Sequence, residues 1–161
     1  MSNIIVLSFK GEFVAEGLLE EFLKMQEEGL IVLEDAVAVR TNAAGQIEIK
    51  QSHKTGGKTA LKGAGIGLLA GLLLGGPIGG LAAGAVIGGI SSKMKDYGID
   101  DNFIKSTSRA LSPNSSAIFL LVKEAKAQEV LDRMKTYEAI ILTTTLSPEK
   151  EKQLRAIIEK N

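Results

Sequence analysis

The segment Thr55–Thr59, with the sequence Thr-Gly-Gly-Lys-Thr, is the part of the chain that comes nearest to a known chemical motif. It follows a strand-like run and precedes a helix-like run, as a phosphate-binding P-loop does. The complete pattern G-x-x-x-x-G-K-[ST] needs a glycine at position 52, where this chain has Ser52. We therefore interpret the segment as a basic collar in front of an apolar helix, and we expect no nucleotide or other cofactor.

Acid–base, nucleophilic and metal chemistry have little support either. The chain has no cysteine and only one histidine, His53, so thiolate zinc sites, histidine clusters and a serine–histidine relay lack their residues. Carboxylate pairs such as Glu20-Glu21 are neighbours in the sequence, and neighbouring residues on a helix do not face each other. The sequence therefore predicts no catalytic residue, no metal site and no enzymatic activity.

The unusual feature of the chain is an apolar segment between Lys62 and Lys93. Its 30 residues carry no charge, and 11 of the 18 glycines of the chain lie between Gly63 and Gly89. Two sets of glycines recur at every fourth residue, which on a helix places each set on nearly one face. These sets are Gly63, Gly67, Gly71 and Gly75, followed by Gly76, Gly80, Gly84 and Gly88.

This spacing is a glycine zipper, and it predicts close packing between helices in lipid or in a dry protein interface. In water, each interior glycine costs a helix about 0.8–1 kcal/mol relative to alanine. A smooth glycine face offsets that cost where it lets another helix approach closely. The alternative is a flexible linker, but linkers combine glycine with polar residues, whereas this segment combines it with leucine, isoleucine, alanine and valine.

The apolar segment is predicted to form a helical hairpin. Gly75-Gly76-Pro77 lies at its middle, and Pro77 breaks or kinks a helix there. Each arm would be roughly 21–23 Å long, which is short of a hydrocarbon core of about 30 Å. Lysines flank both ends, so both ends are expected on the cytoplasmic side, in contact with anionic lipid headgroups. The flanking lysines are Lys54, Lys58, Lys62, Lys93 and Lys95.

The residues before and after the apolar segment predict two halves of one domain. In the first half, the hydrophobic pattern predicts a strand at Ile4–Phe9, a helix that ends at Gly29, a strand at Leu30–Arg40, and a turn at Asn42–Gly45 that leads into a strand at Gln46–Gln51. In the second half, it predicts a strand at Ala117–Val122, a helix at Ala125–Lys135, a strand at Ala139–Thr144, and a final helix capped by Ser147-Pro148-Glu149.

Two βαβ halves of similar size predict an α+β fold, a ferredoxin-like split βαβ sandwich interrupted by the glycine-zipper hairpin and followed by a C-terminal helix. Two unrelated α/β pieces are the alternative. We expect Ile4–Phe9 to lie beside Ala117–Val122, and the hairpin to project from one end of the sheet. The expected boundaries are 1–52 for the first half, 53–98 for the collar and hairpin, and 99–161 for the second half.

With these features, the chain resembles a bacterial family of uncharacterised predicted membrane proteins that carry a domain of unknown function. The most specific elements are Leu-Glu-Asp-Ala-Val at 33–37, Lys-Thr-Gly-Gly-Lys-Thr-Ala-Leu-Lys-Gly at 54–63, and the zipper that follows. The resemblance covers nearly the whole chain. It implies a bacterial origin and membrane association, but no activity.

Three functions are consistent with the sequence. The favoured one is a non-enzymatic, membrane-associated protein that self-assembles through its hairpins, at the cytoplasmic face of the bacterial inner membrane. The second is a soluble cytoplasmic homo-oligomer, such as a ring, cage or filament, whose hairpins are buried in a dry core. The third is a regulatory module that binds a small ligand at its sheet. The expected partners are other copies of the chain and membrane lipid. Nucleic acid is not expected, because the charge is balanced, with 19 basic and 19 acidic residues, and aromatic residues are few.

Overall fold

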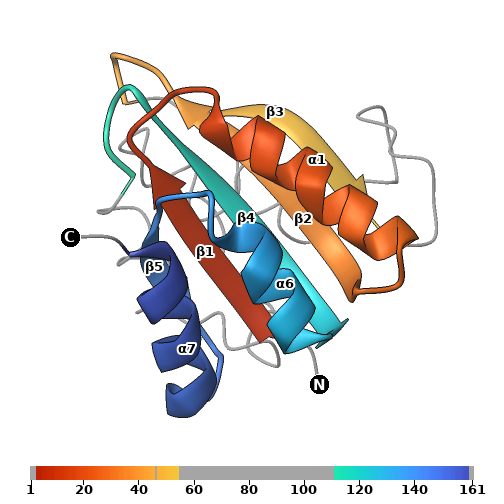
Figure 1. Ribbon diagram of the computed structural model, residues 1–161. Helices are drawn as coiled ribbons and strands as arrows, with labels where there is room; N and C mark the ends of the chain where they lie inside the picture. Colours follow the sequence, from red (N-terminus) through yellow and green to blue (C-terminus); the bar gives the residue numbers. More distant parts are fainter. Residues whose placement is uncertain (1–2, 46, 55–110, 160–161) are drawn as a thin grey trace, which may run out of the picture.

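The computed structural model describes residues 3–45, 47–54 and 111–159, which form a five-stranded sheet with three helices (Figure 1). The elements follow in the order β1 (Asn3–Phe9), α1 (Val14–Glu27), β2 (Ile31–Thr41), β3 (Ile47–Lys54), β4 (Ser115–Ala125), α6 (Ala127–Met134), β5 (Ile140–Thr144) and α7 (Pro148–Ile158). Most of the collar, the glycine zipper and residues 99–110 lie outside the described residues. The expected α+β class is confirmed.

The sheet has the strand order β3-β2-β4-β1-β5, and every neighbouring pair is antiparallel. Two of the inner strands, β1 and β4, come from the two sides of the apolar segment and pair from Asn3 opposite Val122 to Phe9 opposite Ser116. This confirms the expectation that Ile4–Phe9 lies beside Ala117–Val122. The residues before and after the apolar segment therefore share one sheet.

Helix α1 ends where the sequence predicts, because Gly29 adopts a left-handed backbone with φ of 76°. The N–H of Gly29 donates to the carbonyl of Gln26, and the N–H of Leu30 donates to that of Met25. These two bonds form a Schellman motif, which satisfies the last carbonyl groups of a helix. The chain then turns directly into β2.

The turn between β2 and β3 also follows the prediction. The N–H of Gly45 donates to the carbonyl of Asn42 at 3.0 Å, and the side-chain oxygen of Asn42 accepts from the N–H of Ala44 at 2.9 Å. Gly45 has a φ of 80°, which glycine adopts without strain. Strand β3 extends to Lys54, so His53 and Lys54 lie in the strand and not in the collar expected to begin at residue 53.

In the second half, the prediction is wrong about where β4 ends and the next helix begins. The helix expected at Ala125–Lys135 is α6, which begins at Ala127, because β4 continues to Ala125 and pairs there with Ile31 of β2. The final helix, α7, begins as predicted. Ser147 is its N-cap and accepts from the N–H of Lys150, and Pro148 occupies the first turn.

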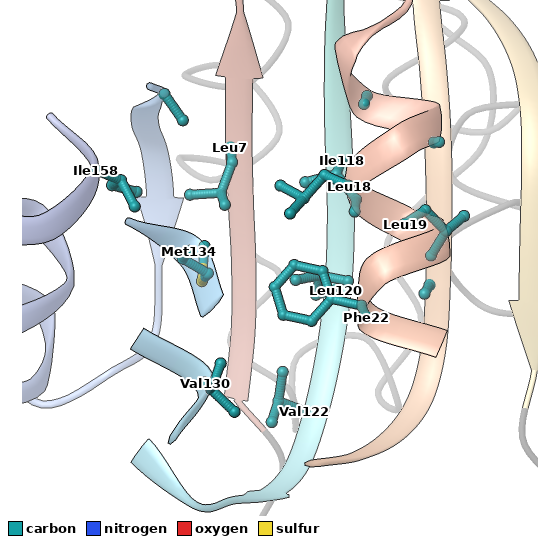
Figure 2. Packing of buried hydrophobic residues seen from close by; sticks show 14 of the residues in the cluster. Leu7, Leu18, Leu19, Phe22, Ile118, Leu120, Val122, Val130, Met134 and Ile158 are labelled. Carbon is teal, nitrogen blue, oxygen red and sulfur yellow. The ribbon is translucent and has the colours of Figure 1, made fainter. Parts of the chain in front are cut away.

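The helices of the described residues, α1, α6 and α7, all cover the same face of the sheet (Figure 1), which we call the first face. Figure 2 shows Leu18 and Phe22 of α1 directed toward Ile118 and Leu120 of β4. From the other side of the core, Val130 and Met134 of α6 and Ile158 of α7 extend the same cluster across β1. The described residues thus form two layers, helices over sheet.

Candidate functional site

Most of the residues that the sequence singles out lie outside the described residues. This holds for the eight zipper glycines, Pro77, Lys58, Lys62, Lys93 and Lys95. Lys54 is placed as the last residue of β3, opposite Asp35 of β2. The described residues nevertheless show where the chain leaves the sheet ahead of the apolar segment, at Lys54, and where it is described again after it, at Leu111.

The strands carry a second apolar face, on the side of the sheet opposite the helices. Successive residues of a strand point to opposite faces of the sheet. Along β1, β2 and β4, residues that pack in the core beneath the helices alternate with residues that are not part of that core. We call these residues the second face: Ile4, Val6, Val37, Val39, Ala117, Phe119 and Leu121. Each of them is between 0 and 3% exposed. The second face of this sheet is therefore shielded from water, as the first face is.

Few polar groups border the second face. Asp35, opposite Leu121, is 4% exposed, and its carboxylate accepts from the N–H of Ala36 at 3.0 Å. Thr41 and Ser115 lie opposite each other at the other end and are also buried. This surface can bury an apolar partner, and its polar groups lie at its two ends.

The chain leaves and re-enters the described sheet at opposite ends. Strand β3 ends at Lys54, opposite Asp35 of β2, whereas β4 begins at Ser115, opposite Thr41 of β2. The six residue steps from Asp35 to Thr41 correspond to about 20 Å of extended strand. The strands that flank the apolar segment therefore run parallel to each other and are not joined by a tight turn. The hairpin lies outside the described residues, so its projection from one end of the sheet stays a prediction.

An apolar pocket of about 170 Å³ lies on the first face, between α6, α7 and the strands. Its walls are mostly aliphatic, with side chains that include Ile5, Leu120, Leu131 and Leu154. Lys123, Lys150 and Gln153 also line it, and all three are exposed. This is where a small apolar ligand would fit if the chain were a ligand-binding module.

A buried serine near the start of β4 supports the start of α1. The N-cap residue of α1 is Phe13, which makes no side-chain capping bond. Instead, the hydroxyl of Ser116 accepts from the N–H of Ala15 at 3.2 Å and donates to the carbonyl of Gly11. No local sequence pattern indicates this role of Ser116, because its two partners lie more than 100 residues away in the chain.

Charged side chains join α6 to α1. Arg133 of α6 donates to Glu21 of α1 at 2.7 Å and also to Glu28. Hydrogen bonds to Glu21 and then Glu28 raise the pKa of the Arg133 guanidinium above its ordinary value. Burial, followed by the charge of Glu21, raises the pKa of Tyr137. Ion pairing therefore accounts for the shift of Arg133, whereas burial is the main cause of the shift of Tyr137.

The described part of the chain has neither a cluster of metal-binding side chains nor a helix suited to cross a membrane. No group of three His, Asp or Glu side chains there lies close enough together to hold a metal ion. None of the helices in residues 3–45, 47–54 and 111–159 combines the length and apolar character that a membrane crossing requires.

Comparison with known proteins places the chain within one family. The model of a family described as a protein of unknown function (DUF1269) matches residues 60–159, which include the apolar segment and the second half of the sheet. Comparisons with curated proteins and with solved structures find no match.

Proposed function

The chain belongs to the family of proteins of unknown function DUF1269, and we propose that it is a non-enzymatic protein that associates with the membrane and self-assembles through its glycine-zipper hairpin. The expectation of a family of unknown function is confirmed by the match. Membrane association, self-assembly and a location at the cytoplasmic face of the inner membrane are our proposals.

The observation that carries this proposal is the uncharged segment of 30 residues with glycines at every fourth position. It lies between two strands of one sheet, so the α/β domain is complete around it. In water, a segment of this composition would expose far more apolar surface than the few hundred Å² that soluble proteins tolerate. Lipid or other subunits are the environments in which a glycine zipper is stable.

The domain that carries the segment is, in our proposal, a ferredoxin-like split βαβ sandwich. Strands β1, β2, β4 and β5 with helices α1 and α6 follow the order βαββαβ and stand side by side as β2-β4-β1-β5. That arrangement has the second strand of each βαβ unit on the outside and the first strands in the centre. Strand β3 is then an addition at the edge, and α7 is the C-terminal extension.

Flotation with lipid vesicles tests the membrane function. Purified full-length chain should float with vesicles that contain anionic lipid and less with zwitterionic vesicles, because Lys58 and Lys62 each contribute about 1 kcal/mol of attraction near an anionic surface. The double variant Lys58→Gln/Lys62→Gln should float less. The matched control is Lys24→Gln/Lys152→Gln, which removes two exposed lysines from α1 and α7. A chain that stays at the bottom with both vesicle types contradicts the proposal.

A soluble homo-oligomer is the second candidate function. It is favoured by the burial of the second face, whose side chains are 0–3% exposed although the described helices lie on the other face. An apolar segment that packs against protein needs no bilayer. Light scattering in buffer without detergent separates the candidates, since a discrete soluble oligomer of the wild-type chain supports the second and a lipid-dependent species supports the first.

A further inference from the structure

We propose that the second face of the sheet is the packing surface of the apolar segment Lys62–Lys93 of the same chain. The proposal identifies where the α/β domain holds this segment. It goes beyond the proposed function, because it concerns a contact within one subunit and does not depend on whether lipid binds.

Burial is the first observation. The second face spans the three inner strands β2, β4 and β1, and even its largest side chain, Phe119, is 0% exposed. At the margin next to edge strand β5 the cover ends, since Ser8 is half-buried and Ile140 is 53% exposed. The covered area is therefore a defined patch over the centre of the sheet.

The described helices cannot provide this cover. Helices α1, α6 and α7 all lie on the first face (Figure 1), and their buried side chains pack with Leu7, Ile118 and Leu120 (Figure 2). Phe119 and Val6 alternate with those residues along β4 and β1, so they point away from the helices. Among the described residues, none of the helices is available to bury them.

The path of the chain is the second observation. Strands β3 and β4 are both antiparallel to β2, so they run parallel, and the 56 residues between Lys54 and Leu111 must return from one end of the sheet to the other. A right-handed crossover would pass over the first face, but α1 already packs on β2 and β4 there. The second face carries none of the described helices, so it is open to the connection.

Size and chemistry are the third observation. The buried stretch of β4 from Ser115 to Leu121 is about 20 Å long, and each arm of the apolar segment would be roughly 21–23 Å long as a helix. The segment has no charge to bury, and its glycines let a backbone approach closely. A second copy of the chain is the competing occupant of the same face.

Site-specific photo-crosslinking tests the proposal in the full-length chain without lipid. A benzoylphenylalanine replaces Phe119 on the second face, and the matched control replaces Phe22, a buried aromatic residue on the first face. Trypsin releases Gly63–Lys93 as one peptide, because it contains no internal Lys or Arg. We expect residue 119 to crosslink to this peptide and residue 22 to crosslink to other peptides.

Isotope mixing separates the two occupants. Heavy- and light-labelled chains are unfolded together and refolded before irradiation, so that any assembly contains both. Crosslinked pairs that are entirely heavy or entirely light support packing within one chain. Mixed pairs at the statistical frequency mean that a second copy covers the face, which overturns the proposal.

A second reporter keeps the test decisive if the bulky group at position 119 prevents folding. The chain has no cysteine, so Ser8→Cys introduces a single thiol at the half-buried margin of the second face, and this thiol can be modified with a benzophenone maleimide. Crosslinking from position 8 to Gly63–Lys93 supports the proposal. Absence of that product from both positions overturns it. Vesicle flotation is a separate experiment. A negative crosslinking result would therefore overturn the packing proposal and leave the membrane function to be tested by flotation.

Discussion

At the scale of single residues, Ser116 connects parts of the fold that are distant in the sequence. Its hydroxyl, on a side chain that is 1% exposed, accepts from Ala15 in the first turn of α1 and donates to the carbonyl of Gly11 in the preceding loop. The first N–H groups of a helix have no partner within the helix. Ser116 therefore supplies from β4 the cap that Phe13 cannot supply.

We predict that Ser116→Ala lowers the free energy of unfolding by about 1–3 kcal/mol, because it leaves a buried N–H without an acceptor. Urea unfolding followed by circular dichroism measures this change. The control is Ser112→Ala, at an exposed position, which should change the free energy of unfolding by less than about 0.5 kcal/mol. Equal stability of the two variants would show that the α1 cap contributes nothing.

At the scale of elements, the local patterns predicted most of the structure. Each strand and helix of the described residues was expected within a few residues, because alternation, apolar spacing, Gly29 and Ser147 are local signals. The early start expected for α6 was wrong because pairing of Ala125 with Ile31 extends β4, and such long-range pairing leaves no local signal. The chain also leaves the sheet at one end and re-enters it at the other. This follows from the strand order, which depends on long-range pairing and likewise leaves no local signal.

Helix α7 is held to the core by its last turns, and we predict that Ile158→Ala loosens the whole element. Ile158 is 0% exposed, and its carbonyl accepts from the N–H of Ala139. Truncation of a buried isoleucine costs about 2–5 kcal/mol. Hydrogen exchange of the peptide that contains residues 148–158 should accelerate strongly. Ile157→Ala, at a half-buried neighbour, is the control and should accelerate it less.

At the scale of the whole molecule, the described residues form a domain that is apolar on both faces of its sheet. The first face is covered by α1, α6 and α7, and the second face is buried without them. The sequence did not indicate the second face, because β4 begins with a run of buried residues, Ser115–Val122, in which side chains of the two faces could not be told apart. The structure shows that the sheet carries a buried apolar surface on the side away from the described helices.

The last prediction concerns assembly, which should depend on the glycines and not on the apolar character of the segment alone. Gly71 and Gly84 lie near the middle of the two predicted arms, and a leucine at either position would force apart helices that pack closely, at a cost of about 1–3 kcal/mol. We expect the wild-type chain, with a mass of 17.0 kDa, to be a homo-oligomer by light scattering, and Gly71→Leu or Gly84→Leu to shift it toward smaller or heterogeneous species. Leu73→Ala reduces apolar surface without adding bulk to a glycine face, so it should matter less. Normal assembly of both glycine variants with loss of assembly in Leu73→Ala would mean that bulk hydrophobic contact, and not a glycine zipper, joins the subunits.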